Sequence, residues 1–191
     1  MTKKSMYKGT REVRTFVDLN HSSHVLILKT KENRKGSYHT TMAALLLTAF
    51  TFEAYLNHLG SGKIKFWDKI ESIRVLDKYE VLCKEFDIEV DFSKRPYQTL
   101  KSLFKYRNSI AHGKSQILEK TETVNASSDP YDHSPKTQWE EFCTLKNAER
   151  AKEDVEQTIT ELHEAAGEGA YPFINGMTVS SMKLKKSDKD S

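Results

Sequence analysis

The sequence contains little cysteine. Cys83 and Cys143 are the two cysteines among 191 residues; they lie sixty positions apart, and neither belongs to a CxxC or similar ligand spacing. This pattern argues against a disulfide scaffold and a zinc site, so reduced thiols in the cytoplasm are the simplest interpretation. The polar start of the chain lacks the apolar segment of a signal peptide, which also predicts a cytoplasmic protein.

Common nucleotide-binding and hydrolase motifs are missing as well. The sequence has no GxGxxG or GxSxG, and Gly60-Ser61-Gly62-Lys63 does not fit the P-loop pattern. These absences remove the main support for kinase, dinucleotide-binding and α/β-hydrolase interpretations. His21 and His24 lie three positions apart but have no third ligand at a suitable spacing, so neither a metal nor a cofactor is expected.

A long uninterrupted apolar run is also missing. The most apolar stretch, residues 42–59, is interrupted by four polar residues: Thr48, Thr51, Glu53 and Asn57. A membrane span needs about 20 consecutive apolar residues. We therefore expect a buried helix here and no association with a membrane.

The composition is that of an ordinary globular protein, with 37% hydrophobic and 30% charged residues. It predicts a single domain over residues 1–191. The formal charge of +3 does not by itself indicate a nucleic-acid-binding protein. Basic residues gather at both ends, with Lys3, Lys4, Lys8, Arg11 and Arg14 at the start and Lys183, Lys185 and Lys186 in the tail. Solvated, partly disordered ends are the preferred interpretation, and phosphate contact is the alternative.

The spacing of apolar residues predicts an all-α fold, a bundle of four or more helices with a long polar loop before the last one. The expected helices span about residues 13–33, 37–59, 66–86, 96–113 and 146–166, with the option of a break near 75–77. The expected core spans about 37–166, after a basic arm and helix over 1–36. A segment rich in Ser, Thr, Asn, Asp and Pro predicts a mobile loop at about 119–138, and the polar tail 167–191 is expected to fray. No alternation of period two is long enough to require a sheet.

Single residues predict the helix ends. Ser37 is a plausible cap for the second helix, and Gly60 is expected to end it in a left-handed conformation. Pro96 suits the first turn of its helix, which Gly113 should close, and Gly167 should close the last. The helix over 37–59 is apolar around nearly its whole circumference, so it should be surrounded by the other elements.

One segment stands out, because an arginine, an amide and a histidine gather at the end of an apolar helix. At ~100° per residue, Arg107 falls inside the apolar stripe of this helix, where an unpaired guanidinium is costly. It must meet either a carboxylate of this protein or a bound phosphate. Glu53, itself placed among apolar residues, is the internal candidate.

Arg107 and His112 differ by roughly 140° on a regular helix, so they do not point the same way. Convergence of the two side chains on one phosphate needs one of three things. These are the long reach of arginine, a distorted final turn, or the same helix of a second copy in a two-fold dimer.

The segment Tyr106-Arg107-Asn108-Ser109-Ile110-Ala111-His112-Gly113 resembles the Arg-x4-6-His motif of the HEPN superfamily, whose members commonly have a polar residue directly after the arginine. Residues 49–57 (AFTFEAYLN) look like the first core helix of many HEPN proteins. Residues 66–71 (FWDKIE) and 77–80 (DKYE) are similar to their second-helix region. The resemblance covers about residues 37–114 well and the last helix loosely. It does not cover the N-terminal arm or the long loop.

The resemblance implies a helical bundle that forms a homodimer, so that two motifs line one cleft, and in many members a metal-independent endoribonuclease. Such enzymes serve as toxins, anti-phage proteins and CRISPR effectors, so an antitoxin or regulatory protein is a candidate partner beside RNA. Other members have lost catalysis. A silent module that binds nucleotide, RNA or protein, and a helical dimerisation scaffold, therefore remain alternatives.

The residue chemistry suits RNA cleavage independently. RNA carries its own nucleophile in the 2′-OH, so a site needs only proton transfer and stabilisation of the phosphate charge. We expect His112 to transfer protons, Arg107 to stabilise the phosphate, and Asn108 to orient either the histidine or the phosphate. Glu53 would support Arg107, and Lys105, Tyr106 and Lys114 are secondary candidates for RNA contact.

Overall fold

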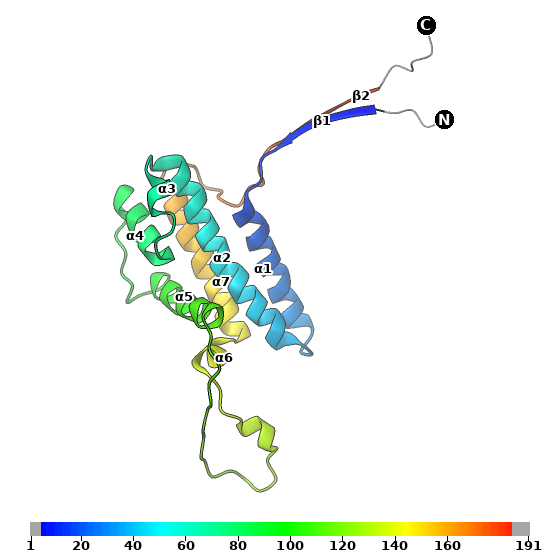
Figure 1. The fold of residues 1–191 in the computed structure, drawn as a ribbon, viewed down its shortest axis with the longest axis vertical. Helices are drawn as coiled ribbons and strands as arrows, with labels where there is room; N and C mark the ends of the chain where they lie inside the picture. Colours follow the sequence, from blue (N-terminus) through cyan, green and yellow to red (C-terminus); the bar gives the residue numbers. More distant parts are fainter. Residues whose placement is uncertain (1–4, 185–191) are drawn as a thin grey trace.

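The computed structural model describes residues 5–184. Within this range the chain forms seven α-helices, one short 3-10 helix and two β-strands (Figure 1). The fold is mostly helical, as the sequence predicts. In the same range, no helix has both the length and the apolar character needed to cross a bilayer.

Helix α2 (Ser37–Lys63) is the centre of the bundle. It packs against five other helices: α1 (Thr15–Glu32), α3 (Trp67–Ile70), α4 (Val75–Glu85), α5 (Tyr97–Ala111) and α7 (Leu145–Ala165). Leu45, Phe52 and Tyr55 of α2 have no exposed surface, whereas Phe50, on the other side of the helix, is 39% exposed. The helix is therefore central, but it is not surrounded on all sides as the sequence predicts.

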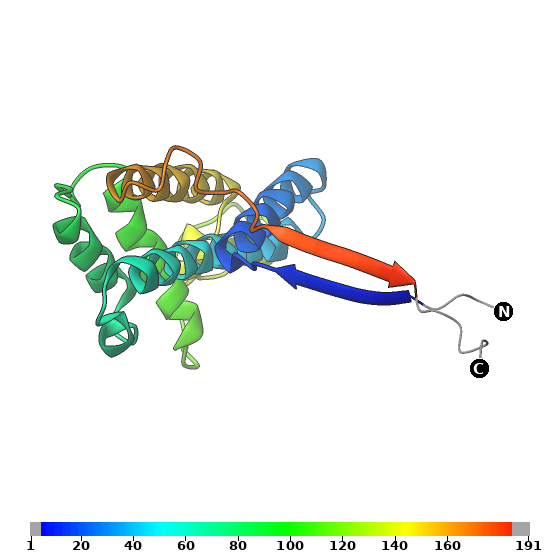
Figure 2. The ribbon, with the colours of Figure 1, turned by 90° about the horizontal axis from the view of Figure 1, so that it is seen from above.

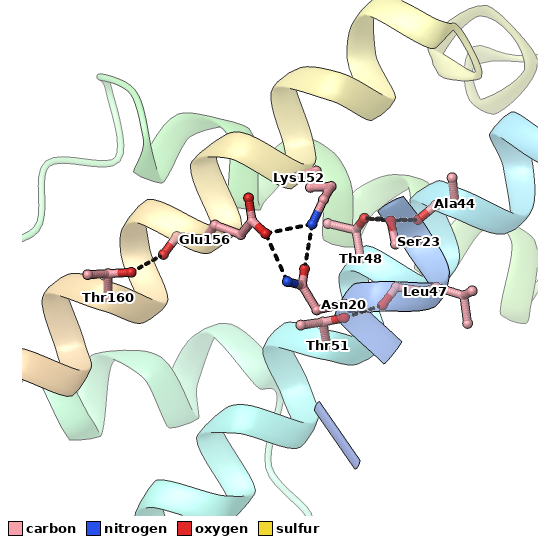
Figure 3. Close-up of polar contacts among 9 residues, drawn as sticks. All are labelled: Asn20, Ser23, Ala44, Leu47, Thr48, Thr51, Lys152, Glu156 and Thr160. Atoms are coloured by element: carbon pink, nitrogen blue, oxygen red, sulfur yellow. Dashed lines mark hydrogen bonds and ion pairs between the residues drawn. The ribbon is translucent and has the colours of Figure 1, made fainter. Parts of the chain in front are cut away.

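Helix α1 belongs to the core, which consequently begins before residue 37. Phe16 and Ile27 are buried against the bundle, and Phe16 meets the ring of Tyr55 edge to face at 5.3 Å. Buried hydroxyls also join α1 to α2, where Ser23 donates to the carbonyl of Ala44 and lies 2.7 Å from the hydroxyl of Thr48 (Figure 3). These hydroxyls satisfy each other and the backbone, which lets the two helices approach closely.

The end of α2 differs from the prediction. The helix continues past Gly60 to Lys63, so Gly60 does not end it. A methyl group on Gly60 would overlap the indole of Trp67, which is buried against it. The glycine thus permits a close approach of α3 rather than a left-handed C-terminus. At the other end Gly36, with φ of 77°, is the N-cap, and Ser37 is the first helical residue without a capping hydrogen bond.

The remaining helices follow the predicted pattern with adjusted bounds. The expected helix over 66–86 is divided into α3 and α4, with the break at residues 71–74. Pro96 is the N-cap of α5, and Gly167 follows α7 with φ of 74°. The predicted helix start at Pro96 and the predicted helix end at Gly167 are therefore confirmed.

A long segment without regular structure, residues 113–137, leaves the bundle after α5 and carries only the 3-10 helix at Pro130–His133 (Figure 1). It returns at α6 (Gln138–Phe142), whose N-terminus has a capping box between Thr137 and Glu140. Phe142 packs on Tyr106 of α5, with ring centres 5.3 Å apart. The segment is thus fastened to α5 at both ends.

The two ends of the described chain correct the prediction that no sheet forms. Strand β1 (Ser5–Arg11) pairs antiparallel with β2 (Thr178–Leu184), and the resulting ribbon extends away from the helices (Figure 2). Lys8, Arg11 and Lys183 lie in these strands, so this part of the chain has regular structure where disordered ends were expected. Lys3, Lys4, Lys185 and Lys186 lie outside the described residues.

Candidate functional site

Helix α5 carries the Arg107, Asn108 and His112 motif at its C-terminal end. Leu100, Leu103 and Phe104 bury one side of the helix in the core. The last turn tightens, because the N–H of Gly113 donates to the carbonyl of Ile110 at 3.3 Å while that of His112 still reaches Asn108 at 3.0 Å. The helix therefore ends with a tightened 3-10 turn at Gly113.

The three motif residues line the same cavity. It has a volume of about 580 Å³, is open to solvent, and lies between α5 and the start of α4. Asn108 and His112 are exposed, and the Arg107 side chain retains 24% of its accessible surface. The imidazole and the guanidinium are thus both reachable by a ligand in one cavity.

Arg107 is held by a carboxylate and an amide. One terminal nitrogen donates to Oε2 of Glu53 at 3.0 Å, and the other donates to Oδ1 of Asn108 at 3.0 Å. The predicted pair between Glu53 and Arg107 is therefore present. The guanidinium also lies 5.6 Å from the ring centre of Phe50, and its buried Nε has no hydrogen-bond partner among residues 5–184.

The Glu53 carboxylate bridges two cations. Its second oxygen lies 3.7 Å from Nζ of Lys78, a side chain that is 2% exposed and donates to Oδ1 of Asn57 at 3.0 Å. A buried ammonium is tolerated only where charge and hydrogen bonds compensate its lost hydration. Glu53 is consequently fixed by Lys78 on one side and Arg107 on the other.

Lys78 is the site-supporting residue that the sequence analysis missed, although a signal for it exists. It occupies the apolar stripe of α4, where Val75, Tyr79 and Leu82 are buried at helical spacing. A lysine inside such a stripe indicates a buried cation that needs an anionic partner.

The rest of the cavity is mixed in charge with a small positive excess. Its lining carries the cations Arg74, Lys101, Lys105 and Arg107 and the anions Glu53, Asp77 and Glu80, together with His112. Arg74 is already paired with Asp77 through two hydrogen bonds of 2.7 and 3.0 Å, and Lys101 lies over the ring of Phe92. Lys105 forms no ion pair within residues 5–184, so its ammonium is available to an anionic ligand, and the exposed imidazole of His112 lines the same cavity.

The three secondary candidates for RNA contact separate in the structure. Lys105 lines the cavity, whereas Lys114 is exposed outside it. Tyr106 is 2% exposed and packs on Phe142, so its nomination as an RNA contact is corrected: it is a core residue. Burial raises the pKa of Tyr106 well above its ordinary value, which is consistent with a neutral, interior phenol.

A second polar cluster joins α1 to α7. Lys152 donates to Asn20 and to Glu156, and Asn20 donates to Glu156, which closes a ring of three side chains (Figure 3). His21 and His24 lie at the rim of the adjoining cavity of about 550 Å³. In the part of the chain that the structure describes, no group of three or more His, Cys, Asp or Glu side chains is arranged to hold a metal ion.

Comparisons with known proteins give no relative for this chain: no family model, no curated protein and no solved structure matches it.

Proposed function

We propose that this chain is a HEPN-like endoribonuclease that cleaves RNA without a metal ion, at the cavity lined by Arg107, Asn108 and His112. The single observation that carries the proposal is that these side chains line one solvent-open cavity at the tightened end of α5. An imidazole can transfer protons and a guanidinium can stabilise phosphate charge, which are the two kinds of assistance that RNA transesterification needs.

The reaction is an internal displacement at phosphorus. The 2′-oxygen forms a bond to phosphorus and loses its proton to a base, while the bond to the 5′-oxygen breaks and that oxygen gains a proton. The products are a 2′,3′-cyclic phosphate and a 5′-hydroxyl. His112 performs one of the two proton transfers, and Arg107 stabilises the negative charge that develops on the phosphate oxygens.

A second copy of the chain completes this scheme. One imidazole does not serve as base and acid in the same step, and each cavity contains one histidine, His112. A two-fold dimer that brings two α5 ends together would supply His112 of the second copy for the other transfer. The exposed position of His112 is compatible with such an arrangement.

One observation favours a different function. Arg107 already donates hydrogen bonds to Glu53 and Asn108, so a phosphate must displace Asn108 or bind at the remaining N–H groups of the guanidinium. If these bonds do not open, the same motif is structural, and the chain is a silent binding module or a dimerisation scaffold.

RNA cleavage in EDTA distinguishes these functions. The purified chain is incubated with an unstructured 30-nucleotide RNA, beside His112→Ala, Arg107→Ala and the control Lys114→Ala, an exposed lysine outside the cavity. Loss of the proton-transfer group should slow cleavage by about 10²- to 10⁴-fold, whereas the control should cleave as wild type does. Mass spectrometry of the products should find the cyclic phosphate.

Thermal melts make the result interpretable. His112 is exposed and its side chain forms no hydrogen bond within residues 5–184, so His112→Ala should melt within about 2 °C of wild type. Arg107→Ala removes the partner of Glu53 and should lose stability as well as activity. Equal cleavage by wild type and His112→Ala, or no cleavage by the wild-type dimer, would leave the scaffold or binding function in its place.

A further inference from the structure

The ribbon formed by β1 and β2 is a polar surface outside the helical core. Every residue of β1 and residues 178–183 of β2 are exposed, and the strands pair over seven positions from Ser5 with Leu184 to Arg11 with Thr178. It projects from the bundle in both views (Figures 1 and 2). Because the ribbon buries none of these side chains, packing in the core does not account for its sequence.

The two segments at the base of the ribbon are joined to each other. The backbone N–H of Glu12 donates to the carbonyl of Met177 at 3.0 Å. The guanidinium of Arg14 bonds the Glu12 carboxylate at 2.8 Å and also reaches the carbonyl of Ile174. These contacts extend the pairing of the two segments toward the start of α1.

Its two faces have different chemistry. Directly paired residues share a face, and faces alternate along each strand. One face therefore presents Lys8 and Lys183 together with the hydroxyls of Thr10 and Ser181. Two ammonium groups and two hydroxyls at the spacing of a strand pair are suitable donors for successive phosphates.

The opposite face carries Arg11 and an aromatic ring. Tyr7 lies over Gly9, where a side chain would collide with the ring, and Met182 stands across from Tyr7. The tyrosine covers the glycine and stiffens a strand pair that lacks a core of its own. Tyr7 keeps 64% of its surface exposed and is free to stack on a base.

Charge is segregated between the ends and the body of the chain. Residues 1–11 and 178–191 together contain eight Lys and Arg and two Asp, a formal excess of six positive charges. The whole chain has a net charge of +3, so residues 12–177 carry −3. The near-neutral total therefore conceals basic sequence ends and a mildly acidic middle of the sequence.

We propose that this ribbon binds the phosphodiester backbone of single-stranded RNA, through Lys8 and Lys183 on one face and through Arg11 on the other. A polyanion is the occupant that complements these cations, none of which pairs with a carboxylate within residues 5–184. The choice of RNA rests on the proposed function, since the same chain carries the candidate cleavage site.

Two other occupants fit less well. A second ribbon would bring like charges together, and lysines on an exposed edge disfavour strand pairing between copies. A membrane surface would need one apolar face to insert, yet Met6 and Val179 lie on one face and Tyr7 and Met182 on the other. RNA requires only the charges, the hydroxyls and a ring.

The test measures binding separately from cleavage. Full-length proteins in a His112→Ala background are titrated into a fluorescein-labelled, unstructured 20-nucleotide RNA, and anisotropy is recorded from 0.05 to 0.3 M NaCl. The ribbon variant combines Lys8→Gln, Arg11→Gln and Lys183→Gln. The matched control removes three exposed lysines from the body with Lys29→Gln, Lys35→Gln and Lys84→Gln.

Three lost phosphate contacts should lower the slope of log K against log salt by about 2, because each contact on a single strand contributes about 0.7. If the parent and the ribbon variant bind equally at 1 M salt, the ribbon variant should bind about 50-fold more weakly than the parent at 0.15 M salt. The control variant should lose less than about 3-fold. Circular dichroism should show the same helical melt for both variants, since all six side chains are exposed.

Several outcomes overturn the inference: equal losses in both triple variants, no loss in the ribbon variant, no RNA binding by the parent, or ribbon-dependent binding to phosphatidylserine vesicles in place of RNA. Cleavage that persists without a ribbon effect on binding removes this inference alone. Ribbon-dependent binding by a wild-type chain that does not cleave removes the proposed function alone.

Discussion

Replacement of Glu53 by glutamine tests the charge network behind the cavity. The carboxylate lies 3.0 Å from Arg107 and 3.7 Å from Lys78, and Lys78 is 2% exposed. At an effective dielectric constant of about 20, each of these ion pairs has an attraction of about 4 to 6 kcal/mol, most of which the desolvation of the charges offsets. Glutamine keeps the shape and still accepts a hydrogen bond from Arg107, but it leaves the buried ammonium without an anion.

We expect Glu53→Gln to lose about 3 kcal/mol of folding free energy. Breaking one side of a buried ion pair costs about 3 to 5 kcal/mol, and the quarter exposure of Glu53 and Arg107 places this case at the lower limit. For a chain of this size the melting temperature should fall by about 6 to 12 °C. Calorimetry and urea denaturation at pH 7 measure the loss.

Glu80→Gln is the matched control, because Glu80 lines the same cavity, is exposed and forms no ion pair within residues 5–184. It should melt within about 2 °C of wild type. A double-mutant cycle with Lys78→Met should give a coupling energy above about 1 kcal/mol, since that variant removes the cation that Glu53 serves. A Glu53→Gln protein that melts like Glu80→Gln, or a cycle with additive losses, refutes the reasoning.

Two further predictions concern the core. Gly60→Ala should lower the melting temperature by several degrees, because overlap with Trp67 costs about 1 to 3 kcal/mol and outweighs the better helix propensity of alanine. Gly62 has open space around it, so Gly62→Ala should raise the melting temperature by about 1 to 3 °C. Equal shifts of the two variants in calorimetry would contradict this contrast. Burial lowers the pKa of His163 from its ordinary value of 6.5, and Nδ1 of His163 lies 3.0 Å from the Tyr55 hydroxyl. The stability contributed by the neutral imidazole should therefore be complete above pH 6.5 and be lost as the pH falls through the folded-state pKa. Between pH 7 and 5, the melting temperature of wild type should fall by more than that of His163→Phe. Parallel pH profiles of the two melting temperatures would contradict the assignment.

The sequence predicted what local periodicity and pairing requirements determine. Helix spacing predicted the bundle, and the need of two charged groups on apolar stripes predicted the contact between Glu53 and Arg107. Glycine at residue 167 and proline at residue 96 marked helix ends because their backbone preferences act locally.

What the sequence did not predict depends on tertiary contacts. Both faces of the ribbon meet solvent, so neither strand needs the alternation that signals a half-buried strand, and the two partners lie at opposite ends of the chain. Gly60 lies inside its helix, where the lack of a side chain permits the close approach of Trp67, a contact that the local sequence does not reveal. Tyr106 is read as a surface phenol until Phe142 returns from a distant segment to cover it.

The excursion of residues 113–137 begins and ends beside the candidate site. It begins at the residue after His112 and ends at α6, whose Phe142 packs on Tyr106, the neighbour of Arg107. The two ends of the excursion thus lie at both margins of the helical turn that carries the imidazole and the guanidinium, so a change in its path would act on that turn from outside the cavity.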